Sequence, residues 1–195
     1  MIYRLLIDPM LNSSHRSAAS MVREGEKVLD VACGTGALAY LIARRTGSRV
    51  TGIDLDQIKL RSAERIFSKG GIKDYRFVHM DATDLSAFAQ NEFDVAVISM
   101  AIHQFSYTVA LDILTEMKRV ATRIIIVDYG FPLKPGFLKW LTYVIEFIAG
   151  GDHYRNFRLY MGRGGVDPIL KAAQLVLRKR IVRGRGTLVI SSCDF

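Results

Sequence analysis

The chain has 195 residues, of which 50% are hydrophobic and 24% charged. We therefore expect one globular domain over residues 1–195 and no disordered tract. Two cysteines are too few for a disulfide framework. The N-terminal segment lacks the apolar core and cleavage site of a signal peptide, and the longest apolar stretch, residues 137–148, is too short to span a bilayer. These features predict a cytoplasmic protein without a transmembrane segment.

The formal net charge is +8, and it is concentrated near the C-terminus. Residues 151–195 contain 9 Lys/Arg against 3 Asp/Glu. Such a tail can attract nucleic acid, anionic lipid or an acidic substrate. A solvated face with arginines for solubility is the simpler interpretation. We therefore do not expect nucleic acid as a partner, although the charge leaves it open.

Apolar runs alternate with segments of helical spacing along the chain. Strands are expected at residues 27–32, 49–53, 75–79, 93–99 and 123–127. Helices are expected at residues 37–45, 57–69 and 109–120, after a first helix that ends near Val22. Strands that alternate with helices imply an open parallel sheet with right-handed crossovers.

The C-terminal part of the chain predicts two further elements. Asp167 and Pro168 are expected to open a helix, with the Asp167 side chain as its cap. Residues 178–182 and 187–191 flank the sequence RGRG and predict a hairpin. The expected fold class is thus α/β, a Rossmann-like doubly wound sheet that is mostly parallel and ends in a C-terminal antiparallel hairpin.

A glycine loop, residues 33–36 (CGTG), directly follows the first predicted strand. Its glycines let the backbone approach a ligand, and the amides that open the next helix favour a negative group. Asp54 ends the second strand, where a carboxylate can accept both hydroxyls of a ribose; Asp56 is expected to cap the following helix. Residues 34–39 also satisfy the dinucleotide pattern GxGxxA, so the loop alone does not select a cofactor.

Two further acids favour a cationic ligand. Asp30 lies in the strand before the loop, where a fixed negative charge would not help to bind a pyrophosphate. Asp81 follows the third strand, at the same edge of the predicted sheet. Three acids around a glycine loop suit a ligand that carries an ammonium, a sulfonium, a ribose and an adenine amino group. That ligand is S-adenosylmethionine, whose product after methyl transfer is S-adenosylhomocysteine.

The segments VLDVACGTG, GIDLD, MDATDL and FDVAVISMAIH, in this order, resemble the successive motifs of class I S-adenosylmethionine-dependent methyltransferases over about residues 26–128. The resemblance implies the seven-stranded methyltransferase fold. Ala32 replaces the first glycine of the family's loop, which a small residue should allow. The resemblance implies that the methionine end of the cofactor is bound by Asp30, Ala32, Cys33, Gly34, Thr35 and Gly36, with Gly34 and Gly36 nearest the ligand. It implies that Asp54 binds the ribose and that Leu55, Asp81 and Ala82 contact the adenine. Ser99 and Met100, after the fourth strand, are also implied to face the cofactor.

Two histidines are candidate catalytic residues. Methyl transfer is an in-line displacement, so alignment supplies most of the catalysis, and a base helps when the acceptor begins protonated. His103 follows the fourth strand and is expected at the mouth of the site, as a base or as a group packed against the cofactor. His15 lies in LIDPMLNSSHR, which is similar to the N-terminal stretch of ubiquinone/menaquinone C-methyltransferases. No metal ligand is expected.

Substrate choice is expected in two segments, the N-terminal cap (residues 1–24) and the insertion after the fifth strand (residues 129–165). The insertion is rich in aromatic side chains and holds the sole Trp140, which predicts an apolar pocket or lid, or an interface such as a homodimer. We expect methyl transfer to a small, apolar or aromatic acceptor. The alternatives are an RNA methyltransferase, a non-catalytic cofactor-binding partner protein, or an NAD-dependent oxidoreductase that uses the same loop.

Overall fold

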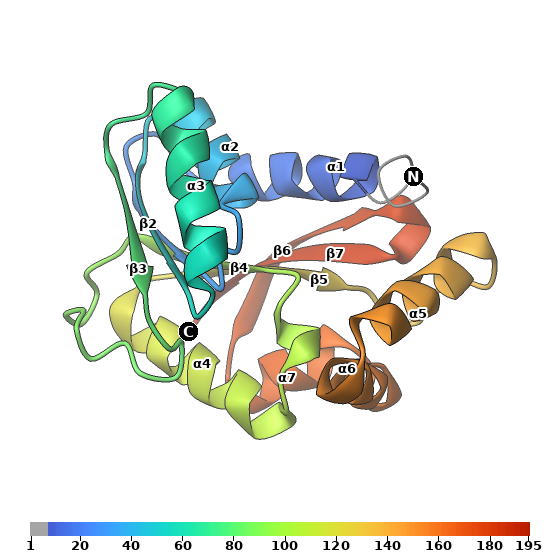
Figure 1. Cartoon of the computed structure of the whole chain (residues 1–195). Coiled ribbons are helices and arrows are strands. Elements are labelled where there is room, and N and C mark those ends of the chain that lie inside the picture. The colour runs from blue at the N-terminus through green and yellow to red at the C-terminus, as the bar shows by residue number, and fades with distance from the viewer. Residues whose placement is uncertain (1–7) are drawn as a thin grey trace.

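The computed structural model describes residues 8–195, so the first seven residues of the predicted N-terminal cap lie outside the described part. Seven strands form one sheet in the order β3-β2-β1-β4-β5-β7-β6 (Figure 1). The parallel strands are β1 (Lys27–Val31), β2 (Arg49–Asp54), β3 (Tyr75–His79), β4 (Val95–Ser99) and β5 (Ile124–Tyr129). β6 (Val176–Arg183) and β7 (Leu188–Asp194) form the antiparallel hairpin, which joins the sheet through β5. The predicted fold class is confirmed.

Helices cover both faces of the sheet (Figure 1). One face carries α1 (Asp8–Ala19), α2 (Ala37–Thr46) and α3 (Gln57–Lys69). The other face carries α4 (Tyr107–Val120), α6 (Gly151–Arg163) and α7 (Val166–Ala172), and α5 (Phe137–Ala149) packs against α6. The described residues also contain two short 3-10 helices: η2 (Ile102–Gln104) follows β4, and η3 (Gly184–Gly186) closes the hairpin.

The apolar runs form strands because both of their faces are covered. Every residue of β5 is buried, and so are the first four of β4. Side chains of alternate strand residues point to opposite faces and join two separate apolar layers. Ile42 and Phe67 lie in the layer beneath α2 and α3, whereas Leu114 and Phe157 lie in the layer beneath α4 and α6.

Two helix starts depart from the sequence predictions. α4 begins at Tyr107, two residues before its predicted start. α7 begins at Val166 after Gly165 and has no side-chain cap, so the predicted cap by Asp167 is wrong. Asp167 lies inside the helix and pairs instead with Arg180 of β6, whose Nη1 donates to Oδ2 at 3.1 Å. Asp56 does cap α3, because its carboxylate accepts from the amides of Ile58 and Lys59 at 2.9 and 3.1 Å. The first helix ends at Ala19, slightly before the predicted residue.

The aromatic side chains of the insertion divide into a buried and an exposed group. Phe157 and Tyr160 of α6 are buried near Tyr129, as core residues. On α5, by contrast, Trp140 and Phe147 are 59% and 66% exposed. The aromatic residues therefore do not act as one lid. Across residues 8–195, no helix has both the length and the apolar character needed to cross a membrane.

Gly52 in the centre of β2 is expected to be intolerant of any side chain. A Cβ there would lie 2.5 Å from the Phe77 ring and 2.9 Å from the Cys33 sulfur. Overpacking of this kind costs about 1–3 kcal/mol, so Gly52→Ala should lower the free energy of unfolding by that amount in urea titrations.

Gly162 supplies the matched control. It lies within α6 with no atom within 4 Å of its ideal Cβ. Because alanine is the better helix former, Gly162→Ala should raise the free energy of unfolding by about 0.5–1 kcal/mol. Equal stabilities of the Gly52→Ala protein and the wild type would show that the sheet is not tightly packed at this strand.

Candidate functional site

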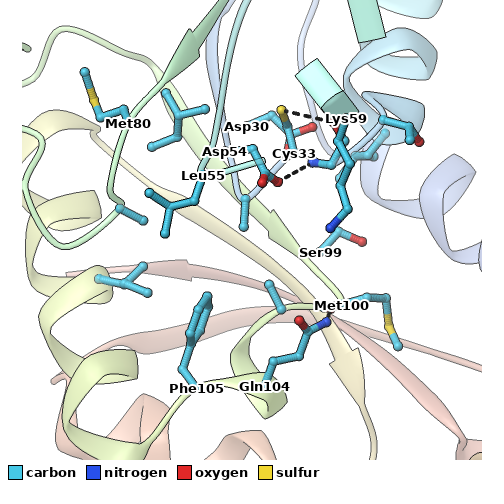
Figure 2. A pocket seen from close by; sticks show the side chains of 18 of the residues that line it. Asp30, Cys33, Asp54, Leu55, Lys59, Met80, Ser99, Met100, Gln104 and Phe105 are labelled. Atoms are coloured by element: carbon cyan, nitrogen blue, oxygen red, sulfur yellow. Dashed lines mark hydrogen bonds between the residues drawn. The ribbon is translucent and has the colours of Figure 1, made fainter. Parts of the chain in front are cut away.

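A cavity of about 720 Å³, here called the main cavity, lies at the carboxyl ends of β1, β2 and β4 (Figure 2). The strand order changes direction between β1 and β4, which is where open α/β sheets bind their ligands. Eleven of the twelve predicted cofactor-binding residues line this cavity: Asp30, Ala32, Cys33, Gly34, Thr35, Asp54, Leu55, Asp81, Ala82, Ser99 and Met100. The fold thus brings together segments that are up to about 70 residues apart in the chain.

Gly36 is the predicted residue that does not line the main cavity. Its φ is +75°, and a Cβ at this position would lie 2.8 Å from Cβ of Ala63. This glycine is therefore required for the close approach of the α2 start to α3, and its expected place near the ligand stays a prediction. Gly34, whose φ is +56°, has only the Lys59 side chain at 4.0 Å from its ideal Cβ, so its backbone borders open space.

Asp54 ties the glycine loop to the end of β2. Its Oδ2 accepts from the Gly34 amide at 2.8 Å, and its Oδ1 accepts from the Asp56 amide at 2.8 Å (Figure 2). A carboxylate has about four lone-pair directions. Two of them hold the backbone here, which leaves acceptor capacity for hydroxyl groups of a ligand in the cavity.

Asp30 is an almost fully buried carboxyl group, with 1% of its surface exposed. Within residues 8–195, its Oδ2 has no hydrogen-bond partner, although nearly all buried polar atoms in proteins have one. Burial raises its pKa from 3.8 to about 8, the charge of Asp54 acts in the same direction, and the Ala39 amide opposes the shift. A cationic group in the cavity would supply the missing partner, so the residues present fit a ligand with an ammonium.

The remaining polar groups of the loop region have simpler roles. Burial, followed by the charges of Asp30 and Asp54, raises the pKa of the Cys33 thiol well above its ordinary range. Cys33 is therefore a small neutral filler and not a nucleophile. The carboxylate of Asp81 accepts from the amide and the hydroxyl of Thr83 at 2.9 and 2.8 Å, which fixes the turn after β3 at the cavity edge.

The wall opposite the acids is mostly apolar. Figure 2 shows Met100, Gln104 and Phe105 on this side, facing Asp30 and Asp54 across the cavity. Leu11, Val109 and Ile113 extend the same wall from α1 and α4. Apart from Met100, the apolar residues of this wall were not predicted from the sequence, because apolar side chains at helical spacing cannot be told from ordinary core residues. Lys59 and Thr83 also line the cavity and carry no local pattern that assigns them to it. Ala32 and Met100, which border the cavity, have positive φ angles of 53° and 54°, an uncommon conformation for residues other than glycine.

His15 reaches the main cavity from α1. Its Nε2 lies 3.0 Å from the Ser99 hydroxyl, and its buried Nδ1 has no partner within the described residues. Burial lowers the pKa of His15 from 6.5 to about 4. The ring is therefore neutral near pH 7 and can exchange hydrogen bonds with a neutral ligand, but it is a weak base.

His103 does not lie at the mouth of the site, contrary to the sequence prediction. It is 1% exposed, and its Nδ1 lies 2.6 Å from Oδ1 of Asp128, whose other oxygen accepts from the His103 amide at 3.3 Å. Burial favours the neutral ring, but the charge and hydrogen bond of Asp128, together with the charge of Glu146, outweigh it and raise the pKa of His103 above 6.5. The ring lines a second cavity of about 240 Å³, here called the histidine cavity, together with Glu146 and His153.

Residues 28–123 match the methyltransferase domain family. Over 86 residues the chain is 38% identical to a ubiquinone biosynthesis O-methyltransferase from Psychrobacter arcticus, covering 44% of this chain and 33% of the relative. Over 130 residues it is 28% identical to a demethylmenaquinone methyltransferase from Staphylococcus aureus, covering 65% and 53%. The chain thus spans about a third to a half of the length of these relatives.

A solved structure agrees in fold. A SAM-dependent methyltransferase from Aquifex aeolicus superposes with a TM-score of 0.61 at 19% identity, covering 88% of this chain and 82% of that one. The matched segment, residues 28–123, contains the glycine loop, Asp54 and the whole edge of the sheet that forms the main cavity. Residues 28–123, about half of the chain, thus belong to the methyltransferase domain family, and the matched relatives support a class I S-adenosylmethionine-dependent methyltransferase.

Proposed function

We propose that this protein binds S-adenosylmethionine in the main cavity and catalyses methyl transfer to a small, apolar or aromatic acceptor. The observation that carries the proposal is the buried Asp30 carboxyl group beside the glycine loop, whose Oδ2 has no hydrogen-bond partner among residues 8–195. The cofactor supplies an activated methyl group on a sulfonium. Asp30 would pair with the ammonium of its methionine part, and Asp54 would accept from its ribose hydroxyls. Leu55 and Ala82 would pack against the adenine, with Asp81 at its edge.

The apolar wall of the main cavity supports the acceptor class. Leu11, Phe105 and Met100 offer surface to an apolar or aromatic ring. His15 and Ser99 would orient one polar atom of the acceptor by hydrogen bonds, since Nδ1 of the neutral His15 ring has no partner among residues 8–195. Two relatives carry the names ubiquinone biosynthesis O-methyltransferase and demethylmenaquinone methyltransferase, which supports the choice of a small-molecule acceptor.

The binding of the cofactor is expected to release a proton from Asp30. Below pH 8 the carboxyl group of the free protein is protonated, because its pKa is raised to about 8. An ammonium beside it favours the charged form and lowers this pKa, so the proton leaves on binding. Calorimetry of S-adenosylhomocysteine binding at pH 7 in buffers of different ionisation enthalpy should show close to one proton released per ligand.

The control for this measurement is Asp30→Asn, which cannot ionise and should show almost no proton release. Equal proton release by the wild type and Asp30→Asn would exclude Asp30 as the partner of the ammonium. Uptake of a proton by the wild type would contradict the assignment as well, since it would require a group whose pKa rises on binding.

The acceptor class is tested by transfer of a labelled methyl group from S-adenosylmethionine. The protein is incubated with a fractionated cell extract and, in parallel, with hydroxylated aromatic compounds that carry apolar side chains and with total RNA. We expect label in the small-molecule fraction and none with the Asp54→Ala protein. Labelled RNA, with binding that falls steeply with salt, would overturn the small-molecule proposal. RNA is the less favoured acceptor, since two arginines of the basic segment at residues 151–195 already form ion pairs, Arg178 with Asp194 and Arg180 with Asp167.

A further inference from the structure

Three side chains with metal-binding atoms meet in the histidine cavity. They come from three elements: His103 from η2, Glu146 from α5 and His153 from α6. One ligand atom of each, a ring nitrogen of the two histidines and a carboxylate oxygen of Glu146, lies within 4.8 Å of the other two. Glu146 Oε2 is 2.5 Å from Nε2 of His153 and 3.6 Å from Nε2 of His103. The second distance is too long for a hydrogen bond.

The surrounding residues orient these atoms toward one point. Asp128 engages Nδ1 of His103 at 2.6 Å, which leaves Nε2 as the nitrogen directed into the cavity. The Tyr129 hydroxyl donates to Oε1 of Glu146 at 2.7 Å, which leaves Oε2 between the two imidazole rings. Carboxylates that hold the remote nitrogen of a histidine are typical of metal centres, because they fix the tautomer and the ring orientation.

The burial of Glu146 calls for a cationic partner. It is the only acidic residue of α5 and is 4% exposed, while Phe147 and Ile148 beside it are 66% and 76% exposed. Burying the Glu146 carboxylate while exposing the apolar side chains of Phe147 and Ile148 costs free energy unless the carboxylate is paired. Within residues 8–195, the ion pairs of Glu146 and Asp128 are formed with histidines alone.

The distances fit a small divalent ion. Bonds of 2.0–2.1 Å in tetrahedral geometry place two ligand atoms about 3.4 Å apart. The distance of 3.6 Å between Nε2 of His103 and Oε2 of Glu146 is already close to this ligand–ligand separation. His153 must withdraw by about 1 Å from its hydrogen bond with Glu146. It can do so because its side chain is 27% exposed and less tightly enclosed than the other two.

We propose that His103, Glu146 and His153 form a binding site for a divalent transition-metal ion of the Zn²⁺ type. Two imidazoles and one carboxylate are a donor set that zinc takes in sites with an open fourth position. Leu11, Met100 and Gln104 line both cavities, so the open position lies next to the proposed acceptor wall. A polar group of the acceptor can reach the ion there. The binding of the metal itself does not depend on the proposed function.

Metal binding is tested on the full chain after treatment with a chelator. Calorimetric titration with Zn²⁺ alone should show one saturable site, and Co²⁺ should give the visible absorption of a low-symmetry nitrogen and oxygen site. His153→Ala and Glu146→Gln should each weaken Zn²⁺ binding at least tenfold. The control is His79→Ala, which removes an exposed histidine of β3 outside the histidine cavity and should bind Zn²⁺ like the wild type.

A crystal soaked with Zn²⁺ provides a second measurement that needs no variant. Anomalous density bonded to the three ligand atoms would support the site even if Glu146→Gln fails to fold. Absence of saturable binding, equal affinity of the wild type and His153→Ala, or anomalous density only at the cysteines or other surface groups would overturn the proposal. In that case the cluster is a hydrogen-bonded network of Glu146 with the two histidines.

Discussion

Asp54→Ala is expected to weaken the binding of S-adenosylhomocysteine at least about 100-fold, because two kinds of interaction are lost together. The carboxylate no longer holds the Gly34 amide and the start of α3 in their present geometry. It also no longer accepts hydrogen bonds from the ribose hydroxyls. Hydrogen bonds to a charged group contribute about 1.5–3 kcal/mol each, so the loss of two corresponds to roughly two to four orders of magnitude in affinity.

Asp56→Ala is the matched control for this experiment. Asp56 stands two residues further along, and its carboxylate caps α3 without lining the main cavity. Its replacement should lower the melting temperature by a few degrees and leave the dissociation constant nearly unchanged. Calorimetric titration of both proteins with S-adenosylhomocysteine measures the two dissociation constants. If Asp54→Ala binds S-adenosylhomocysteine as tightly as the wild type, the ribose is not held by this carboxylate.

His103→Asn is expected to slow methyl transfer roughly 100-fold, within the range known for single catalytic side chains, while the affinity for S-adenosylhomocysteine stays the same. The asparagine amide can still donate to Asp128, which keeps that buried carboxylate paired. It cannot replace Nε2, which lies 3.6 Å from Glu146 Oε2 in the histidine cavity, and this cavity shares Met100 and Gln104 with the acceptor wall. Single-turnover rates with a bound acceptor measure this effect separately from binding.

His103→Ala serves as a comparison, because it leaves Asp128 without its ring partner and should also lower stability. A loss of S-adenosylhomocysteine binding in both variants would assign a structural role to the ring. Equal transfer rates for His103→Asn and the wild type would show that His103 takes no part in methyl transfer, either by accepting a proton or by binding a metal ion.

The fold was predictable because its determinants are local. The run RIIIV becomes the fully buried β5, and the segment from Gln57 to Lys69 is a helix with the predicted bounds. Residues that follow a parallel strand directly must lie at its carboxyl end. Asp54 and Ser99 could therefore be assigned to the main cavity as soon as their strands were recognised.

Side-chain partners that are distant in the chain could not be predicted in the same way. His103 turns away from the main cavity because Asp128, 25 residues further along, holds its ring. Gly36 allows the start of α2 to pack against Ala63. Asp167 lies inside α7 and forms an ion pair with Arg180 instead of capping the helix. Glu146 lies in the apolar stretch of residues 137–148, and the folded chain brings it to two histidines, His103 and His153. Each case depends on a contact that local sequence patterns do not encode.

On the proposed function, the acids around the glycine loop select a cationic adenosyl compound. This selection can be observed in a crystal structure of the protein soaked with S-adenosylmethionine. We expect density in the main cavity with the ribose hydroxyls on Asp54 and the ammonium within hydrogen-bond distance of Asp30 Oδ2. A main cavity left empty by this ligand, or one that binds a nicotinamide dinucleotide in its place, would overturn the proposed selection.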